Sequence, residues 1–132
     1  MHAHCSYDYA VIRVVPRVER EEFVNVGVIV ACPPKDFLEA RIELDEPRLQ
    51  ALDPTLDLDS IRRHLASIPL ICVGGEAAGP IGKLSRRERF HWLIAPRSTI
   101  IQTSPVHTGR CTNLADTLEH LLNVMVRPSR GG

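Results

Sequence analysis

Alternating apolar and polar positions dominate the first 45 residues and predict three consecutive β-strands. Residues 7–16 (YDYAVIRVVP) and 23–32 (FVNVGVIVAC) are rich in β-branched and aromatic side chains, and residues 37–45 (FLEARIELD) alternate apolar with charged positions. Side chains along a strand point to opposite faces of its sheet, so each segment has an apolar face suited to a core. Turn-forming residues at 16–22 and 33–36 separate the segments, and we expect an antiparallel meander.

The second of these segments contains a polar interruption. Asn25 and Gly27 share one predicted face of residues 23–32, whereas valines occupy the other face. A glycine inside a strand is typical of a β-bulge or of a close approach by another backbone, and Asn25 would satisfy the loosened hydrogen-bond ladder. The alternative is a polar notch that binds a ligand or the backbone of a partner.

Helical spacing replaces the alternation in the second half of the chain. Apolar residues recur at steps of three and four between Leu58 and Ile68, with Asp57 as N-cap, which predicts a helix laid on a sheet. Residues 85–95 open with a capping box, and residues 113–126 carry an apolar stripe that begins after Asn113 or Thr112. Between these two helices we expect a fourth strand at 98–103 and a loop at 104–110.

These elements predict an α+β fold. We expect an antiparallel sheet of about four strands, with the helices that begin at Asp57 and Asn113 packed on one face. A strongly bent small β-barrel with helices is the alternative. We assign residues 1–6 to a flexible N-terminus, residues 7–126 to a single domain and residues 127–132 to a disordered tail.

Composition indicates the class of protein and its compartment. Hydrophobic residues make up 44% of the chain and charged residues 24%, as in an ordinary globular domain. No apolar run approaches the roughly 18 residues that span a bilayer, and the N-terminus lacks the plan of a signal peptide, so we expect a cytoplasmic protein without membrane contact. Because the sequence contains no C-x-x-C pair, we expect four free thiols at Cys5, Cys32, Cys72 and Cys111.

The two halves of the chain carry opposite charge, although the net charge of the whole chain is zero. Residues 67–132 carry 8 basic and 4 acidic groups, whereas residues 1–66 carry 8 and 12. Arginines beside aromatic residues can bind phosphates and stack on bases, so residues 83–97 are a candidate nucleic-acid interface. The neutral overall charge favours instead a solvated start of a helix. The candidate residues are Lys83, Arg86, Arg87, Arg89 and Trp92.

Three further groupings suggest catalysis or cofactor binding. Ser104 with His107 suggests the nucleophile and base of a hydrolase, but the sequence has no G-x-S-x-G elbow, and Ser-Pro is typical of a turn. His2, His4 and Cys5 could bind a metal only without a preorganised second shell. The glycine-rich residues 73–84 match no nucleotide-binding motif. We therefore expect no metal and no other cofactor, and we favour a protein that is not an enzyme.

Two long segments together resemble a known family. YDYAVIRVVPRVEREEFVNVGVIVACP and RFHWLIAPRSTIIQTSPVHTG are similar to the bacterial family called domain of unknown function 3037, over roughly residues 7–126. The resemblance implies a small stand-alone α+β protein without an established activity, and a partner or regulatory role with a HipA-type kinase as one candidate partner. It transfers no catalytic residue. It marks a candidate shared surface at Glu22, Phe23, Asn25, Gly27, Arg97, Ser98, Ser104, Pro105, His107 and Gly109.

We therefore favour a non-enzymatic protein-binding or adaptor module. Its polar surface would comprise Glu22, Asn25, Arg97, Ser98, Ser104 and His107. We expect the second and fourth strands to be neighbours, with Glu22 paired to Arg97. A homodimer is a further expectation, because a four-stranded sheet leaves edges that a second copy can cover. The alternatives are a nucleic-acid-binding protein that uses residues 83–97 and a small hydrolase that uses Ser104 and His107.

Overall fold

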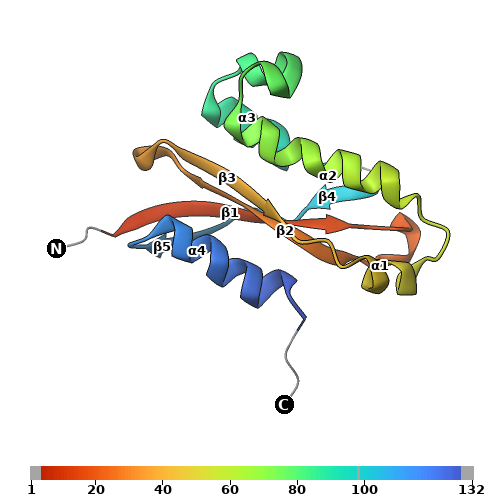
Figure 1. Cartoon of the computed structure of the whole chain (residues 1–132). Helices are drawn as coiled ribbons and strands as arrows, with labels where there is room; N and C mark the ends of the chain where they lie inside the picture. The colour runs from red at the N-terminus through yellow and green to blue at the C-terminus, as the bar shows by residue number, and fades with distance from the viewer. Residues whose placement is uncertain (1–3, 98, 129–132) are drawn as a thin grey trace.

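Three strands from the first 42 residues form the body of an antiparallel sheet. The computed structural model describes residues 4–97 and 99–128. In it β1 (Cys5–Val14), β2 (Val24–Cys32) and β3 (Phe37–Ile42) follow one another as a meander with β2 in the middle (Figure 1). The predicted meander is confirmed. The first strand already begins at Cys5, inside the segment 1–6 predicted to be a flexible terminus.

Two short strands complete the sheet on the far side of β1. Both β4 (Ile101–Thr103) and β5 (His107–Cys111) pair antiparallel with β1, giving the order β3-β2-β1-β4, with β5 beside the first half of β1. The loop predicted over residues 104–110 is therefore wrong for β5. The turn-forming residues of this segment favoured a loop, whereas β5 forms a strand because its backbone hydrogen-bonds to β1.

Helices cover both faces of the sheet (Figure 1). On one face α2 (Leu58–Val73) and α3 (Arg86–Ile94) pack against a core that includes Ile12 and Ile29. On the other face α4 (Leu114–Leu121) and the π-helical turn η4 (Leu122–Val126) pack against Val28 and Val30. The α+β class is confirmed, and the sheet does not close into a barrel. The helices lie on two faces rather than one, because β2 is apolar on both sides and each side must be kept from water.

The three predicted N-caps are confirmed. The Asp57 carboxylate accepts from the Ser60 N–H, Asn113 accepts from the Asp116 N–H, and Ser85 forms a capping box with Glu88. The remaining helical segments are short: η1 (Val18–Arg20), η2 (Pro33–Lys35), α1 (Glu46–Leu52) and η3 (Glu76–Lys83). Within the described residues, no single helix is both long and apolar enough to cross a membrane.

Gly27 lies at a β-bulge, as the sequence predicted. Ile12 pairs with Gly27 and Arg13 with Asn25, so Val26 has no counterpart in β1. A Cβ atom on Gly27 would also lie 2.5 Å from the Arg41 carbonyl oxygen in β3. The bulge and the close backbone approach, which the sequence left as alternatives, therefore occur together.

The cysteines and the C-terminal segment differ from expectation. Cys5 and Cys32 form a disulfide-bonded pair, so the prediction of four free thiols is wrong for these two residues. Neighbouring strands bring them together across 27 residues, which spacing alone did not reveal. Cys72 and Cys111 are free. Arg127, placed in the disordered tail by the sequence, donates to the carboxylates of Glu43 and Glu119.

Candidate binding groove

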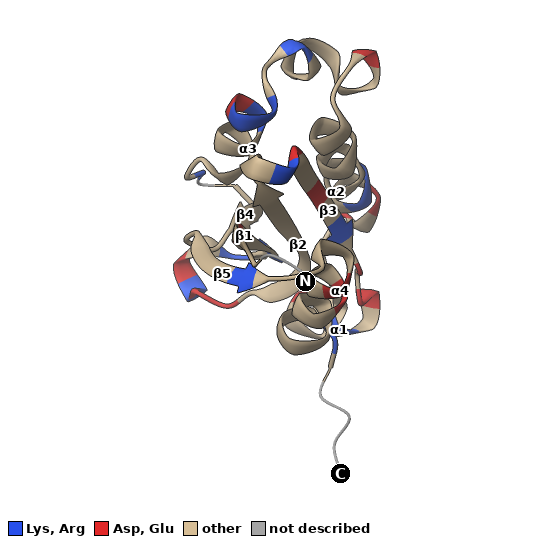
Figure 2. Ribbon diagram, turned by 90° about the vertical axis from the view of Figure 1, so that its left-hand side faces the viewer, with Lys and Arg blue, Asp and Glu red and all other residues tan. Residues whose placement is uncertain are grey.

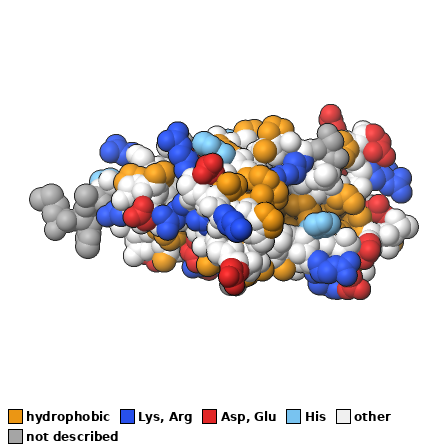
Figure 3. All heavy atoms as spheres, turned by 90° about the horizontal axis from the view of Figure 1, so that it is seen from above, with side chains coloured by type: hydrophobic (Ala, Val, Ile, Leu, Met, Phe, Trp, Pro, Cys, Tyr) orange, Lys and Arg blue, Asp and Glu red, His pale blue; other side chains and the backbone are white. Residues whose placement is uncertain are grey.

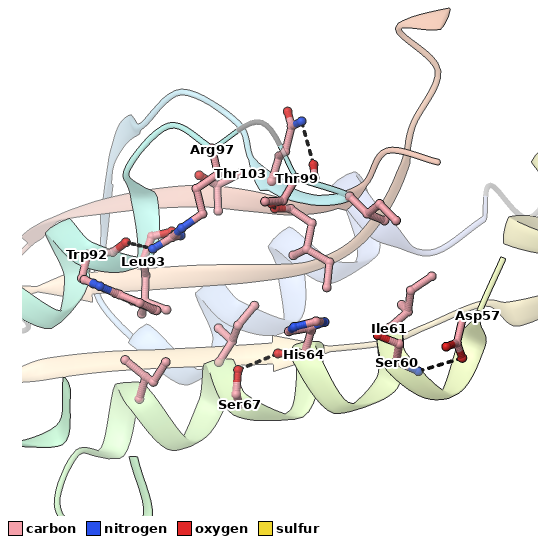
Figure 4. Close-up of a pocket in the computed structure, with 15 residues that line it drawn as sticks. Asp57, Ser60, Ile61, His64, Ser67, Trp92, Leu93, Arg97, Thr99 and Thr103 are labelled. Atoms are coloured by element: carbon pink, nitrogen blue, oxygen red, sulfur yellow. Dashed lines mark hydrogen bonds between the residues drawn. The ribbon is translucent and has the colours of Figure 1, made fainter. Parts of the chain in front are cut away.

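An open groove of about 500 Å³ runs between α2 and the segment that connects α3 to β4 (Figure 4). One wall is a face of α2 that runs from Asp57 through His64 to Ile71, at the three- and four-residue spacing of a helix. The opposite wall consists of the end of α3, including Trp92, and residues 99–103. The volume lies within the range of roughly 300–1,000 Å³ that is typical of ligand pockets.

The groove exists because α2 does not cover its whole face of the sheet. This helix packs mainly over β3, and its contacts with β4 are few. The space between α2 and β4 therefore stays open to the surface, and the space-filling view of this side shows apolar side chains exposed among charged ones (Figure 3).

The lining combines an apolar floor with a rim that includes two large apolar side chains. The buried part of the lining consists of Ile61, Ile68, Ile71 and Leu93. At the rim the Trp92 and Ile100 side chains remain 40% and 43% exposed, although both are large and hydrophobic. Soluble proteins seldom leave such side chains together at a concave surface unless something binds there.

Arg97 fixes one end of the groove. Its guanidinium donates to the carbonyl groups of Trp92 and Leu93, at 2.6 and 3.2 Å, and its Cζ atom lies 4.3 Å from the centroid of the Trp92 ring. It therefore satisfies carbonyl groups at the end of α3 and holds the exposed indole by a cation–π contact. Figure 4 shows Arg97 and Trp92 side by side at this end.

The predicted ion pair between Glu22 and Arg97 is wrong. Glu22 pairs with Arg20, and the guanidinium of Arg97 is used as described above. The two strands that we expected to be neighbours are β2 and β4, and β1 lies between them.

The other residues of the predicted polar surface do not join Arg97 at the groove. Asn25 donates from Nδ2 to the Met125 carbonyl, and His107 stacks on Tyr9 with ring centroids 5.3 Å apart, both on the face that α4 covers. Ser104 is buried between β1 and the turn to β5. Ser98 lies outside the described residues. The described residues of the predicted surface therefore do not form one continuous polar patch.

Ser104 has a structural role that occupies its hydroxyl. The Oγ atom accepts from the Val11 N–H at 2.9 Å and lies 2.9 Å from the Pro105 carbonyl, while the Ser104 N–H donates to the Val11 carbonyl at 2.8 Å. None of the hydrogen bonds of the described residues joins Ser104 to His107, which is exposed. The arrangement anchors the junction of β4 and β5 to β1, and it lacks the serine–histidine contact on which a hydrolase depends.

The candidate nucleic-acid residues separate into different environments. Arg89 is buried and donates to the carbonyl groups of Ile71, Cys72 and Leu84. Arg86 lies 3.4 Å from Asp36, whereas Lys83 and Arg87 are exposed. Trp92 belongs to the groove. Figure 2 shows basic and acidic residues close together near α3 rather than one basic face.

No preformed metal site is found among residues 4–97 and 99–128, because no group of three His, Cys, Asp or Glu side chains lies close enough to hold an ion. His2 lies outside the described residues. The free thiol of Cys72 is buried, and desolvation raises its pKa to about 12, so it is a poor nucleophile.

Sequence reasoning missed the groove because its two walls are about 30 residues apart. Along the chain His64 has the position of an ordinary histidine at the edge of an amphipathic helix, and Ile100 that of a residue within a strand. The available signal was the apolar pair Ile100 and Ile101 downstream of Trp92, but only the packing of α2 shows that these residues line a groove.

Comparison with known proteins adds one result. A family model described as "Protein of unknown function (DUF3037)" matches residues 9–126, which is most of the chain. No curated protein and no solved structure matches.

Proposed function

The chain belongs to the family of proteins of unknown function DUF3037, so we propose its function from the groove. We propose that it is a protein-binding module that holds an extended apolar segment of a partner protein between α2 and β4. The role is that of a non-enzymatic adaptor. A HipA-type kinase, which the family resemblance suggested, is the first partner to test.

One observation carries this proposal: the rim residues Trp92 and Ile100 stay exposed above a buried apolar floor. Covering both side chains with an apolar segment would remove hydrophobic surface from water, and burial of one large side chain stabilises a complex by roughly 1.5–3 kcal/mol. Aromatic anchors of this kind are common at the centre of protein interfaces.

The strand beside the groove supports an extended rather than a helical partner segment. β4 is at the edge of the sheet. The Val15 N–H donates to the Ile100 carbonyl and the Ser104 N–H to the Val11 carbonyl, so the even-numbered residues of this segment face β1. By the alternation of an antiparallel ladder, the backbone groups of Ile101 and Thr103 point outward.

These outward groups can accept a further strand. Thr99 Oγ1 donates to the Ile101 carbonyl, which leaves the N–H groups of Ile101 and Thr103 and the Thr103 carbonyl for a partner backbone. A strand added to a sheet edge gains affinity from main-chain hydrogen bonds and specificity from pockets for alternate side chains. The groove offers such a pocket, since residues 99–103 all line it.

The proposal is tested with a displayed library of random peptides selected on the full chain. We expect enrichment of peptides that alternate apolar and polar residues. In fluorescence anisotropy, Ile100→Glu should weaken the best peptide at least tenfold, which is about 1.4 kcal/mol. The matched control is Val124→Glu, because Val124 is an exposed apolar residue of η4, on the other face of the sheet.

Three outcomes would contradict the proposal. Peptides that bind both variants as tightly as the unchanged chain do not use the groove. Selected peptides without an apolar pattern point to another surface. A stable dimer in sedimentation equilibrium that Ile100→Glu dissociates would show that a second copy, and not a partner protein, covers this edge.

A further inference from the structure

Arg13, in the middle of β1, is a half-buried cation without a counter-ion among the described residues. Its Nε atom is fully buried and has no hydrogen-bond partner in the same part of the chain. Burial lowers the pKa of this guanidinium from its ordinary value, and none of the described carboxylates is near enough to raise it again. Withdrawing a charge from water without compensation is costly, so such a group is uncommon in a stable fold.

Comparison with the other arginines shows how exceptional this is. Five arginines are buried or half-buried in the described part of the chain: Arg13, Arg41, Arg89, Arg97 and Arg127. Arg41 and Arg127 pair with carboxylates, and Arg89 and Arg97 donate to helix-end carbonyl groups. Arg13 alone in this group has neither kind of partner.

The surroundings hold Arg13 in a defined orientation. Its Cζ atom lies 4.1 Å from the centroid of the Phe23 ring, and Phe23 is itself 45% exposed. Asn25 on β2 and Gln102 on β4 are its cross-strand neighbours. The Asn25 amide is fixed by its donation to the Met125 carbonyl, so its Oδ1, which is buried and unpartnered among the described residues, cannot turn toward water.

We propose that Arg13 binds a carboxylate, presented by an acidic side chain or the C-terminus of another protein. The guanidinium lies against an aromatic ring, and its terminal nitrogens, unlike the buried Nε, can form the two parallel hydrogen bonds of an arginine–carboxylate pair. Both cross-strand neighbours are neutral amides, so one positive charge matches the single negative charge of a carboxylate better than the higher charge of a phosphate. Asn25 and Phe23 are positioning residues for this arginine.

Nuclear magnetic resonance of the 15N-labelled full chain tests this inference. Sodium acetate is added at constant ionic strength, with chloride as the balancing anion, and the arginine Nε–H signals are followed. We expect the Arg13 signal, identified by its loss in Arg13→Lys, to shift along a saturable curve. The matched control signal is that of Arg63, which is exposed and has no ion-pair or hydrogen-bond partner among the described residues.

Phe23→Leu keeps the charge but removes the aromatic platform, and we expect it to weaken acetate binding about threefold or more. An Arg13 signal that moves no further than that of Arg63 would overturn the proposal. So would a saturable response to inorganic phosphate without one to acetate. Arg13, Phe23 and Asn25 do not line the groove, so peptide binding by the groove succeeds or fails independently of this result.

Discussion

Gly74 leaves room for the side chain of Arg89: a Cβ atom on Gly74 would lie 2.8 Å from Arg89 Cζ and still closer to Nη1. That nitrogen donates to the carbonyl groups of Ile71 and Cys72, at 2.9 Å each, and Nε donates to the Leu84 carbonyl at 3.2 Å. An arginine of α3 thus satisfies the last carbonyl groups of α2. Because α2 and α3 contribute to opposite walls of the groove, this contact helps to set the distance between them.

Replacing Gly74 by alanine should therefore destabilise the protein more than replacing Gly75. Both glycines have positive φ angles, +82° and +84°, but a Cβ atom on Gly75 meets nothing within 4 Å. The backbone strain, on the order of 1–3 kcal/mol, is common to both variants, and only Gly74→Ala also displaces Arg89. We expect an additional loss of about 2 kcal/mol in the free energy of unfolding, measured by urea denaturation.

A double-mutant cycle separates the two causes. In an Arg89→Met background the extra cost of Gly74→Ala should disappear, because no guanidinium remains to be displaced. If Gly74→Ala and Gly75→Ala are equally destabilising in the unchanged chain, the contact with Arg89 does not matter to stability.

The stability that Asp53 provides should depend on pH. Hydrogen bonds from the Thr55 hydroxyl and backbone N–H, with a smaller effect of Arg17, lower the pKa of the Asp53 carboxyl. A depressed folded-state pKa stabilises the fold above the unfolded value of about 3.9, and this contribution is lost as the pH falls through the folded value. The difference in unfolding free energy between the unchanged chain and Asp53→Asn should be largest near pH 7 and shrink below about pH 4. A difference that stays constant down to pH 2.5 would refute this account.

Ser104 should prove to be structural rather than catalytic. Ser104→Ala leaves the buried Val11 N–H without its side-chain acceptor, which we expect to cost about 1–3 kcal/mol in urea denaturation. His107→Ala should change stability by less than about 0.5 kcal/mol, because His107 is exposed. A fluorophosphonate probe should not label the unchanged chain. Labelling at Ser104 that is lost in His107→Ala would support the hydrolase instead.

Nucleic-acid binding through residues 83–97 should be weak. Arg89 is buried and Arg86 is paired with Asp36, so Lys83 and Arg87 remain the freely exposed cations of that candidate set. In fluorescence anisotropy with single-stranded DNA, the logarithm of the binding constant should fall with the logarithm of salt at a slope no steeper than about −2. A steeper slope that Arg87→Gln reduces, while the control Arg63→Gln does not, would favour the nucleic-acid alternative.

Features with local causes could be predicted from the sequence. Asp57, Ser85 and Asn113 cap helices because their side chains reach backbone N–H groups three residues away. Gly27 marks its bulge because a glycine, which has no side chain to pack, weakens a regular strand but fits where the ladder is interrupted. The first three strands followed from alternation, which is also a local property of the chain.

Features with distant causes were missed. β5 pairs with β1 across about 100 residues, and its sequence follows Ser104-Pro105 and contains Gly109, as an ordinary loop would. The sequence did not predict which face of the sheet each helix covers. Both faces of β2 are apolar and must be shielded from water, but this does not indicate which helix covers which face.

The sequence by itself determined most of the segments that become strands or helices and where most of them begin, since propensities, caps and turns act over a few residues. Only the tertiary structure decided the partners. It turned Arg89 from a candidate surface cation into the buried cap of α2, left Arg13 without a counter-ion among the described residues, and opened a groove between α2 and β4. Burial and charge pairing depend on which side chains the fold brings within a few ångströms of each other, and separation along the chain does not report that distance.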